Sequence, residues 1–289
     1  MKILVTGAAG RLGSVVTKSL LEGGHDVRAT DHRHRRDFPV RLELADLRDE
    51  LRAYALVEGC DVVVHLGNHP NLFSGPSPQR LFSDNVTMNA NVFRAAVDTG
   101  VRKLVFASSI QATLCMHEGT RPEPPYEIPY MPLDGELPAN PGTNLYGLSK
   151  EVGERLLQLH ARRFPELSCT ALRFPVLAND WWLRRMGAES GRVNRDWLSF
   201  GEGLAYLLMP EAAEVVRAVV ERQTPGYHQY FPASCIQLRG YRTSDLLEQF
   251  YAGVPLKRPA SEIEFLIDTS AITRAVGWTP TQSLQVELD

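Results

Sequence analysis

A tyrosine and a lysine four residues apart form the pair in this chain best suited to moving a proton. Tyr146 and Lys150 stand in the segment Tyr-Gly-Leu-Ser-Lys, and this spacing puts both side chains on one face of a helix. An ammonium beside a phenol favours the phenolate and lowers the pKa of the phenol. The pair therefore predicts a general base, and Ser108, Ser109 and Asn85 are polar residues that could stand near it.

A glycine-rich segment near the N-terminus provides a second candidate site. The order Gly7-Ala8-Ala9-Gly10-Arg11-Leu12-Gly13 follows a short apolar run and precedes a helical pattern. Glycines at this place permit a tight turn and a close approach of the backbone to a pyrophosphate at a helix N-terminus. The segment predicts a dinucleotide-binding loop, and the positive nicotinamide ring of an oxidised dinucleotide would further favour the Tyr146 phenolate.

The residues after the second predicted strand bear on which dinucleotide is bound. Asp31 closes that strand, where a carboxylate can accept hydrogen bonds from both ribose hydroxyls and would repel a 2′-phosphate, which favours NAD. Arg33, Arg35 and Arg36 could instead pair with such a phosphate, so NADP stays the alternative. No metal site is predicted, because arginines surround His32 and His34.

Apolar segments rich in β-branched residues alternate with helical periodicity from the first residue, which predicts a doubly wound α/β fold with a parallel Rossmann sheet. Ligands of such sheets bind at the carboxyl ends of the strands. The predicted strands are 3–6, 27–31, 40–44, 61–66, 103–108 and 169–174. Predicted helices follow the glycine-rich segment and span 48–58, 80–99 and 146–164, with later helices at 211–222, 244–251 and 269–277 and a strand-like run at 227–236.

The composition changes twice along the chain. Seven of the nineteen prolines fall between Arg121 and Gly142, which predicts a long ordered loop above the carboxyl edge of the sheet. After Phe174 a segment rich in tryptophan and arginine begins. We therefore predict a dinucleotide-binding domain over 1–175 and a smaller substrate-binding lobe over 176–289, with segments near 205–235 returning to the Rossmann sheet.

Composition and charge exclude several classes of protein. Thirty-one Lys and Arg against 34 Asp and Glu give a net charge of −3, which removes the electrostatic basis for binding nucleic acid or an anionic membrane. No apolar run is long enough for a membrane span or a signal peptide. The four cysteines stand far apart, without a zinc or disulfide pattern. A cytoplasmic location is the expectation.

Taken together, the motifs resemble the extended short-chain dehydrogenase/reductases of the NAD-dependent epimerase/dehydratase family. They occur in the family's order and cover nearly the whole chain, ending with a Gly-Trp-x-Pro turn similar to that of nucleotide-sugar epimerases and dehydratases. The matching motifs are Gly7-x-x-Gly10-x-x-Gly13, Asp46-Leu47, His65-Leu66-Gly67, Asn85, Ser108-Ser109, Tyr146-x-x-x-Lys150 and Gly277-Trp278-Thr279-Pro280.

The resemblance implies a role for each matching position. Tyr146 would be the general base, Ser109 would hydrogen-bond the reacting oxygen, and Lys150 would bind the nicotinamide ribose. Asn85 would have a structural role. The remaining cofactor contacts would come from the glycine-rich segment and Asp31, from Asp46 and Leu47 at the adenine, from Leu66 and Gly67, and from Ala107, Ser108, Phe174, Pro175 and Val176.

Departures from the family pattern reduce the number of reactions that we expect of this chain. Ile110-Gln111 stand where dehydratases carry an Asp-Glu pair, so dehydration is disfavoured. Arg258 occupies the place of an arginine that grips a nucleotide diphosphate in relatives, but Ser261-Glu262 follow where Gly-Asp is usual. The leading hypothesis is an epimerase acting on a sugar or nucleotide sugar. The alternatives are a sugar or uronate dehydrogenase and a protein that binds the dinucleotide without turnover.

Substrate contacts and assembly are the remaining expectations. Candidate substrate residues are Asn68, Ile110, Gln111, Arg185, Arg192 and Arg258. The tryptophan and arginine segment could stack a base or pair with phosphates, or it could be ordinary packing. Family resemblance also implies a homodimer that pairs through the helices at 80–99 and 146–164.

Overall fold

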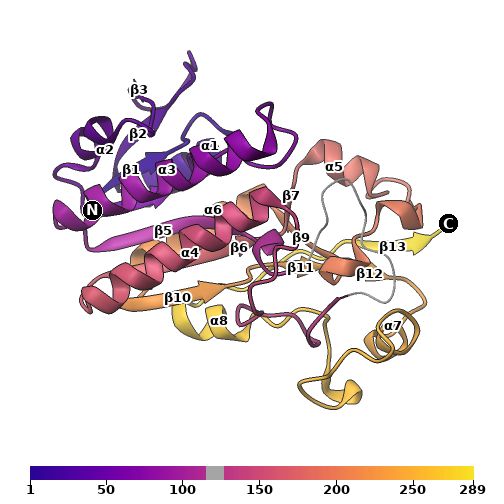
Figure 1. Ribbon diagram of the computed structural model, residues 1–289. Helices are drawn as coiled ribbons and strands as arrows, with labels where there is room; N and C mark the ends of the chain where they lie inside the picture. Colours follow the sequence, from indigo (N-terminus) through magenta and orange to yellow (C-terminus); the bar gives the residue numbers. More distant parts are fainter. Residues whose placement is uncertain (115–126) are drawn as a thin grey trace.

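The computed structural model describes residues 1–114 and 127–289 of the chain. Seven parallel strands form its central sheet in the order β10-β6-β5-β4-β1-β2-β3 (Figure 1). The doubly wound parallel fold expected from the sequence is confirmed. The strands are β1 (Lys2–Thr6), β2 (Asp26–Asp31), β3 (Leu42–Leu44), β4 (Val62–His65), β5 (Lys103–Ser109), β6 (Ser168–Phe174) and β10 (Gly226–Tyr230).

Helices cover both faces of this sheet because each face buries an apolar surface. On one face, α1 (Arg11–Glu22) and α6 (Met209–Arg222) pack together over a core that includes Val5 and Val216. The other face carries α2 (Glu50–Val57), α3 (Pro78–Asp98) and α4 (Leu145–Arg163), which enclose Phe93 and Phe106. The inner strands β1, β4, β5 and β6 are largely buried on both sides, as their continuous apolar runs require.

The order of the strands reverses direction between β1 and β4, which are neighbours in the sheet. Strands β1, β4 and β5 bring Thr6, His65 and Phe106 into one register row near their carboxyl ends. In open sheets of this type, ligands bind in the crevice at such a reversal point. The glycine-rich segment follows β1 directly and therefore lies at this edge.

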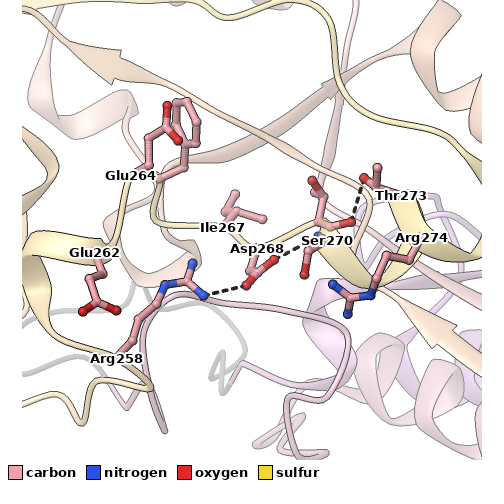
Figure 2. Close-up of a pocket in the computed structure, with 10 residues that line it drawn as sticks. Arg258, Glu262, Glu264, Ile267, Asp268, Ser270, Thr273 and Arg274 are labelled. Atoms are coloured by element: carbon pink, nitrogen blue, oxygen red, sulfur yellow. Dashed lines mark hydrogen bonds and ion pairs between the residues drawn. The ribbon is translucent and has the colours of Figure 1, made fainter.

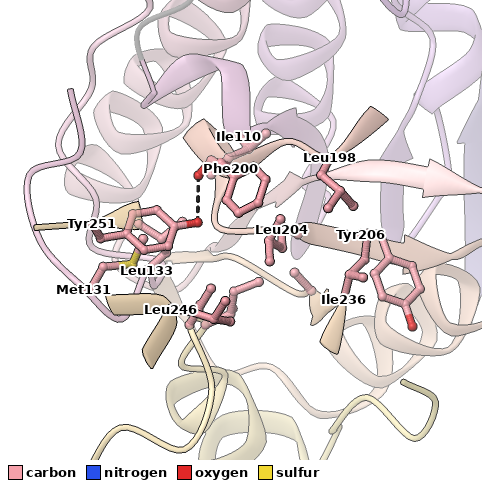
Figure 3. Close-up of a cluster of buried hydrophobic side chains, with 14 of the residues drawn as sticks. Ile110, Met131, Leu133, Leu198, Phe200, Leu204, Tyr206, Ile236, Leu246 and Tyr251 are labelled. Atoms are coloured by element: carbon pink, nitrogen blue, oxygen red, sulfur yellow. Dashed lines mark hydrogen bonds between the residues drawn. The ribbon is translucent and has the colours of Figure 1, made fainter. Parts of the chain in front are cut away.

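A second apolar core lies beyond the carboxyl ends of the strands (Figure 3). It draws Ile110 from the end of β5 together with C-terminal residues such as Leu204, Tyr206 and Leu246. Tyr251 donates a hydrogen bond of 2.9 Å to the carbonyl of Phe200 within it. Two helices contribute to this core, α5 (Asp180–Arg185) and α7 (Thr243–Phe250). It also contains two three-stranded sheets. One has the order β11 (Ser234–Cys235), β9 (Ala205–Leu208), β7 (Val176–Ala178), and the other has the order β12 (Gln237–Leu238), β13 (Gln285–Leu288), β8 (Arg192–Val193).

The segments between 205 and 235 divide between the two cores. Helix α6 covers the Rossmann sheet and β10 extends it beside β6, whereas β9 pairs with β7. The run at 227–236, expected as one strand, is two strands in different sheets. Pro232 lies between them, and its fixed φ and missing N–H interrupt the pairing. The division of the chain into domains at residue 175 stays a prediction.

The proline-rich loop lies partly outside the described residues, and its described part, 127–142, has no helix and no regular strand. It runs along the second core, where Met131 and Leu133 are fully buried and bridge to Leu256 and Ile267. The carbonyls of Gly135 and Leu137 accept hydrogen bonds from Arg173 of β6. Residues 127–142 are thus attached to the carboxyl edge of the sheet, and the first part of the predicted loop lies outside the described residues.

The last helix, α8 (Ser270–Val276), packs against α6 and ends at Gly277, which has a left-handed φ of +68°. Trp278 is buried next to it in the core under α6. The predicted closing helix and its glycine stop are confirmed. Within residues 1–114 and 127–289, no helix combines the length and the apolarity needed to cross a bilayer.

Candidate active site

The turn between β1 and α1 is shaped so closely that only glycine fits at two of its positions. Gly7 has φ +66°, and a Cβ there would lie 2.7 Å from the carbonyl oxygen of Leu66. A Cβ at Gly13 would lie 2.1 Å from the carbonyl oxygen of Gly7. Gly10 precedes α1, and no side chain caps that helix, so its first N–H groups are open to an anion. The turn therefore fits a dinucleotide pyrophosphate.

Asp31 is placed beside this turn at the end of β2. Its side chain is almost fully buried, and it accepts hydrogen bonds from the backbone of Ala9 at 3.1 Å and of Arg33 at 2.9 Å. His32 and Arg33 approach the same carboxylate, at 3.2 and 3.9 Å. A carboxylate fixed here is suited to accepting hydrogen bonds from a ribose diol. The neighbouring Arg33 keeps one cation near the position that a 2′-phosphate would take.

The predicted adenine contacts lie on the other side of the turn. Leu47 is buried and approaches Gly67, where an added Cβ would meet its side chain at 2.8 Å. The carboxylate of Asp46 is occupied by Arg48, which lies 2.6 Å away and lowers the pKa of that carboxyl. Arg48 also reaches Asp84 on α3 at 3.2 Å. Asp46 thus belongs to an ion-pair network in the structure, and its role toward adenine stays a prediction.

Helix α4 positions the predicted proton-transfer pair. Asn144 caps the helix by accepting a hydrogen bond from the N–H of Gly147, and this fixes the first turn, where Tyr146 lies. Tyr146 and Lys150 are both buried, and the Lys150 ammonium is 5.6 Å from the centroid of the Tyr146 ring. Ser109, at the end of β5, lies near the Tyr146 hydroxyl, and its side chain lowers the pKa of that phenol. The structure brings all three predicted catalytic residues together.

The Lys150 ammonium is held by oxygen atoms. It donates to the carbonyl of Ala107 at 2.7 Å and to Oδ1 of Asn68 at 2.9 Å, and it lies 4.9 Å from the centroid of the Phe106 ring. Burial nevertheless lowers the pKa of Lys150 to about 7, because the charged form has lost its water.

The pKa of Tyr146 differs from the expectation. Burial raises it to about 12, and the nearby Ser109 side chain offsets only part of this rise. The expected lowering rested on the ammonium and the nicotinamide ring, whereas desolvation dominates among the protein's own groups. A lowered phenol pKa therefore depends on further positive charge, such as a nicotinamide ring.

A buried ion pair under the site was missed in the sequence. Glu154 of α4 and Arg173 of β6 form two hydrogen bonds, of 2.9 and 2.7 Å, and Ser108 donates to Glu154 at 2.6 Å. The same arginine holds the proline-rich loop. Ser108 thus faces a structural ion pair while the adjacent Ser109 faces Tyr146, as alternation along a strand requires. The spacing of Tyr146, Lys150 and Glu154 by four residues was the available signal.

Asn85 and the remaining predicted cofactor positions lie around the same edge. Asn85 is fully buried and bonds the backbone of His69 and the hydroxyl of Ser149, which accounts for a structural role. Phe174 and Pro175 are buried at the end of β6, whereas Val176 is 37% exposed.

The candidate substrate residues divide into two groups. Asn68 contacts Lys150, and Ile110 and Gln111 follow Ser109 directly, so these three lie next to the catalytic group. Gln111 accepts a hydrogen bond from Asn144 at 3.0 Å. Arg185 instead covers the ring of Trp197, 3.8 Å from its centroid, and Arg192 lies 3.6 Å from Glu287. Their predicted contact with substrate is untested.

Arg258 lines a pocket of about 420 Å³ between the second core and α8 (Figure 2). Its guanidinium is 3.0 Å from the carboxylate of Asp268, which in turn accepts from the N–H of Ser270. Glu262, Glu264 and Arg274 line the same pocket, and Asp268 is the carboxylate that contacts this arginine. Its charge is therefore already paired within the protein.

The sequence pattern of the NAD dependent epimerase/dehydratase family matches residues 3–202. The chain belongs to this family. It is accordingly an NAD-dependent enzyme, and its glycine turn and Asp31 fit that cofactor as described above.

Two relatives in this epimerase/dehydratase family have named activities. L-arabinose 1-dehydrogenase (NAD(P)(+)) of Haloferax volcanii is 33% identical over 212 residues, which cover 70% of this chain and 78% of that protein. Uronate dehydrogenase of Agrobacterium fabrum is 32% identical over 170 residues, which cover 56% of this chain and only 57% of that protein. A UDP-glucose 4-epimerase from Bifidobacterium longum, solved with NAD+ and UDP, has a TM-score of 0.67 at 20% identity over 98% of this chain and 94% of that one, which shows the shared fold.

Proposed function

We propose that this protein is an NAD-dependent dehydrogenase that oxidises a hydroxyl group of a sugar or sugar acid. The observation that carries the proposal is the arrangement of Ser109, Tyr146 and Lys150 at the carboxyl edge of the sheet, next to the glycine turn. General base, hydroxyl orienter and cation are the three protein groups needed to remove a proton from an alcohol. NAD, when bound, supplies the acceptor for the hydride and a positive ring.

Each of these side chains has a separate task. Ser109 holds the substrate oxygen, because its hydroxyl lies near the Tyr146 hydroxyl that takes the proton. The Tyr146 oxygen takes the hydroxyl proton, and the Lys150 ammonium stabilises the phenolate through its charge. Burial of both side chains excludes water and strengthens this interaction.

The surroundings of Arg258 support a substrate without a nucleotide. A diphosphate would need the guanidinium that Asp268 occupies at 3.0 Å, and it would meet the carboxylates of Glu262 and Glu264. Arg185 and Arg192 remain proposed contacts for an anionic group of the substrate. Replacing either with alanine should then raise KM for the substrate and leave the affinity for NAD unchanged.

Epimerisation of a nucleotide sugar is the second candidate. It is supported by the closing segment, in which α8 ends at Gly277 at the start of the epimerase-like Gly-Trp-x-Pro motif, and Trp278 of this motif is buried. An epimerase would use the same base and return the hydride to the opposite face of the substrate, so that no cofactor is consumed.

One assay distinguishes the two reactions. The purified protein is mixed with NAD, then with NADP, and with a panel of uronic acids, free aldoses and nucleotide sugars. Reduced-nicotinamide absorbance and new sugar isomers are followed in each mixture. Net absorbance with a free sugar or sugar acid supports the dehydrogenase. Isomers of a nucleotide sugar without net absorbance would replace it with the epimerase, and neither signal with any member would contradict both.

Two wider expectations stay predictions: a cytoplasmic location and a homodimer formed through α3 and α4. Light scattering at micromolar concentration tests the dimer, and a single species at the monomer mass would contradict it.

A further inference from the structure

A chain of polar side chains runs from the end of β1 to the catalytic lysine. Thr6 Oγ1 lies 2.7 Å from Nδ1 of His65, and Nε2 of His65 lies 2.9 Å from Oδ1 of Asn89. The Nδ2 group of Asn68 reaches the same Asn89 oxygen at 2.9 Å. Asn68 Oδ1 then accepts the bond from Lys150 at 2.9 Å. Four strand and helix segments contribute to this single connection.

The donors and acceptors fix the direction of each hydrogen bond in this series. Thr6 Oγ1 accepts the N–H groups of Leu66 at 3.2 Å and Gly67 at 3.1 Å, so its own proton is free for His65 Nδ1. His65 must then carry its proton on Nε2 and donate to Asn89. Burial, aided by the charge of Lys150, lowers the pKa of His65 to about 3, so the ring stays neutral.

The orientation of Asn89 is fixed for the same reason. Its Oδ1 receives two donors, whereas its Nδ2 is buried and has no partner among the described residues. Turning the amide over would face three N–H groups toward one another. Gly153 of α4 permits this approach, since a Cβ there would lie 2.9 Å from Asn89 Nδ2. The Asn89 amide keeps this orientation although its buried Nδ2 group forms no hydrogen bond with the described residues, which indicates that the residue has a role other than packing.

We propose that His65, Asn89 and Asn68 are positioning residues, which orient the amide oxygen that holds the Lys150 ammonium and connect it to the backbone beside the glycine turn. Asn89 fixes the Asn68 amide, and the Asn68 oxygen fixes the ammonium opposite the Ala107 carbonyl. This assigns Asn68 to the lysine, in place of the substrate contact expected from the sequence. No residue of the chain is required to gain or lose a proton for this role.

The charged state of Lys150 is the property to measure. The titratable groups around it are Tyr146, Glu154 and His65, and Glu154 alone favours the ammonium. The chain has only five lysines, so selective ¹³Cε labelling gives five resonances: Lys2, Lys18, Lys103, Lys150 and Lys257. Lys150→Arg assigns the relevant one, and its titration midpoint is then read in the full-length protein without any substrate.

Removing the amide oxygen should disfavour the ammonium. In Asn68→Ala we expect the Lys150 midpoint about one pH unit lower, because the variant loses a hydrogen bond that the amide oxygen accepts from the charged form. Asn89→Ala should lower the midpoint in the same direction, although it touches no atom of Lys150. Asn91→Ala is the matched control on the same helix, since its amide bonds only the carbonyls of Leu47 and Arg48, and it should leave the midpoint unchanged.

Two outcomes would overturn the proposal. One is an unchanged midpoint in Asn68→Ala, whose half-exposed position makes its fold robust even if Asn89→Ala does not fold. The other is a folded Asn89→Ala protein whose midpoint equals that of Asn91→Ala. Only the kinetic consequence rests on the proposed function: with the dehydrogenase substrate, both variants should move the acidic limb of kcat/KM to higher pH. A protein without that activity would still show the NMR shifts.

Discussion

The Lys150 ammonium lies 5.6 Å from the centroid of the Tyr146 ring while it donates to the carbonyl of Ala107 at 2.7 Å. The lysine is thus held by strand β5, and its ammonium forms no ion pair with the tyrosine. In the proposed mechanism the ammonium acts on Tyr146 through its charge, and the Ala107 carbonyl fixes the ammonium in place.

Replacing Tyr146 with phenylalanine removes the proposed base and little else. We expect kcat to fall about 10²–10⁴-fold, the usual contribution of a positioned acid or base. The affinity for NAD and the unfolding temperature should stay near those of the native protein. The measurement is turnover beside NAD titration of the same sample, and unchanged turnover would refute the catalytic assignment.

The pH dependence of stability should report the buried lysine. The pKa of Lys150 is about 7 in the folded protein and near its ordinary 10.5 when unfolded, so the unfolded chain binds the extra proton between these values. The contribution of Lys150 to stability therefore rises with pH from about 7 to 10.5.

The comparison that isolates this effect is between the native protein and Lys150→Met. The free energy of unfolding of the native protein, minus that of the variant, should increase between pH 7 and pH 9 in denaturant titrations. Other titrating groups cancel in the difference. A difference that is constant over this range would contradict the lowered pKa.

Gly13→Ala should abolish tight binding of NAD. The new Cβ would lie 2.1 Å from the carbonyl oxygen of Gly7, so the turn must open at the place proposed for the pyrophosphate. We expect a Kd for NAD raised at least about tenfold, equivalent to about 1.4 kcal/mol, measured by calorimetry. Ser14→Ala, at the next residue of α1, is the control and should bind normally, because the Ser14 hydroxyl donates to the carbonyl of Arg11 within the helix.

Asp31→Ala should weaken NAD and reduce the discrimination against NADP. The change removes the carboxylate proposed for the ribose diol and leaves Arg33 available to a 2′-phosphate. We expect the ratio of the two dissociation constants to move toward NADP by about tenfold or more. Asp37→Ala in the exposed segment that follows is the control, and an unaltered ratio in Asp31→Ala would contradict the assignment.

Arg173→Met should destabilise the fold strongly. It leaves the carboxylate of Glu154 buried without its partner, which costs about 3–5 kcal/mol in other buried pairs, and it releases the carbonyls of Gly135 and Leu137. Arg155→Met is the control. It breaks the ion pair between the exposed Arg155 and Glu151 on α4, the helix that carries Glu154, and should lower the free energy of unfolding by at most about 1 kcal/mol. Equal unfolding free energies for the two variants would show that the buried pair contributes no more to stability than the exposed pair.

The sequence by itself determined the alternation of strands and helices, the glycine turn and the Tyr146–Lys150 pair. These features depend on local periodicity, on glycine conformation and on spacing along one helix. Pro232 interrupts the strand-like run at 227–236, whereas the tertiary structure decided the partners of its two parts, since Gly226–Tyr230 pairs with β6 and Ser234–Cys235 pairs with β9.

Only the tertiary structure decided the environment of the reacting groups. Burial raises the pKa of Tyr146 to about 12. Chain folding also pairs Arg258 with Asp268, ten residues away, and Lys150 with Asn68, 82 residues away. Desolvation depends on every atom packed around a group, and a hydrogen bond depends on which distant segment supplies the acceptor. Residue type and spacing therefore predicted which side chains could react, whereas packing set their charge and their partners.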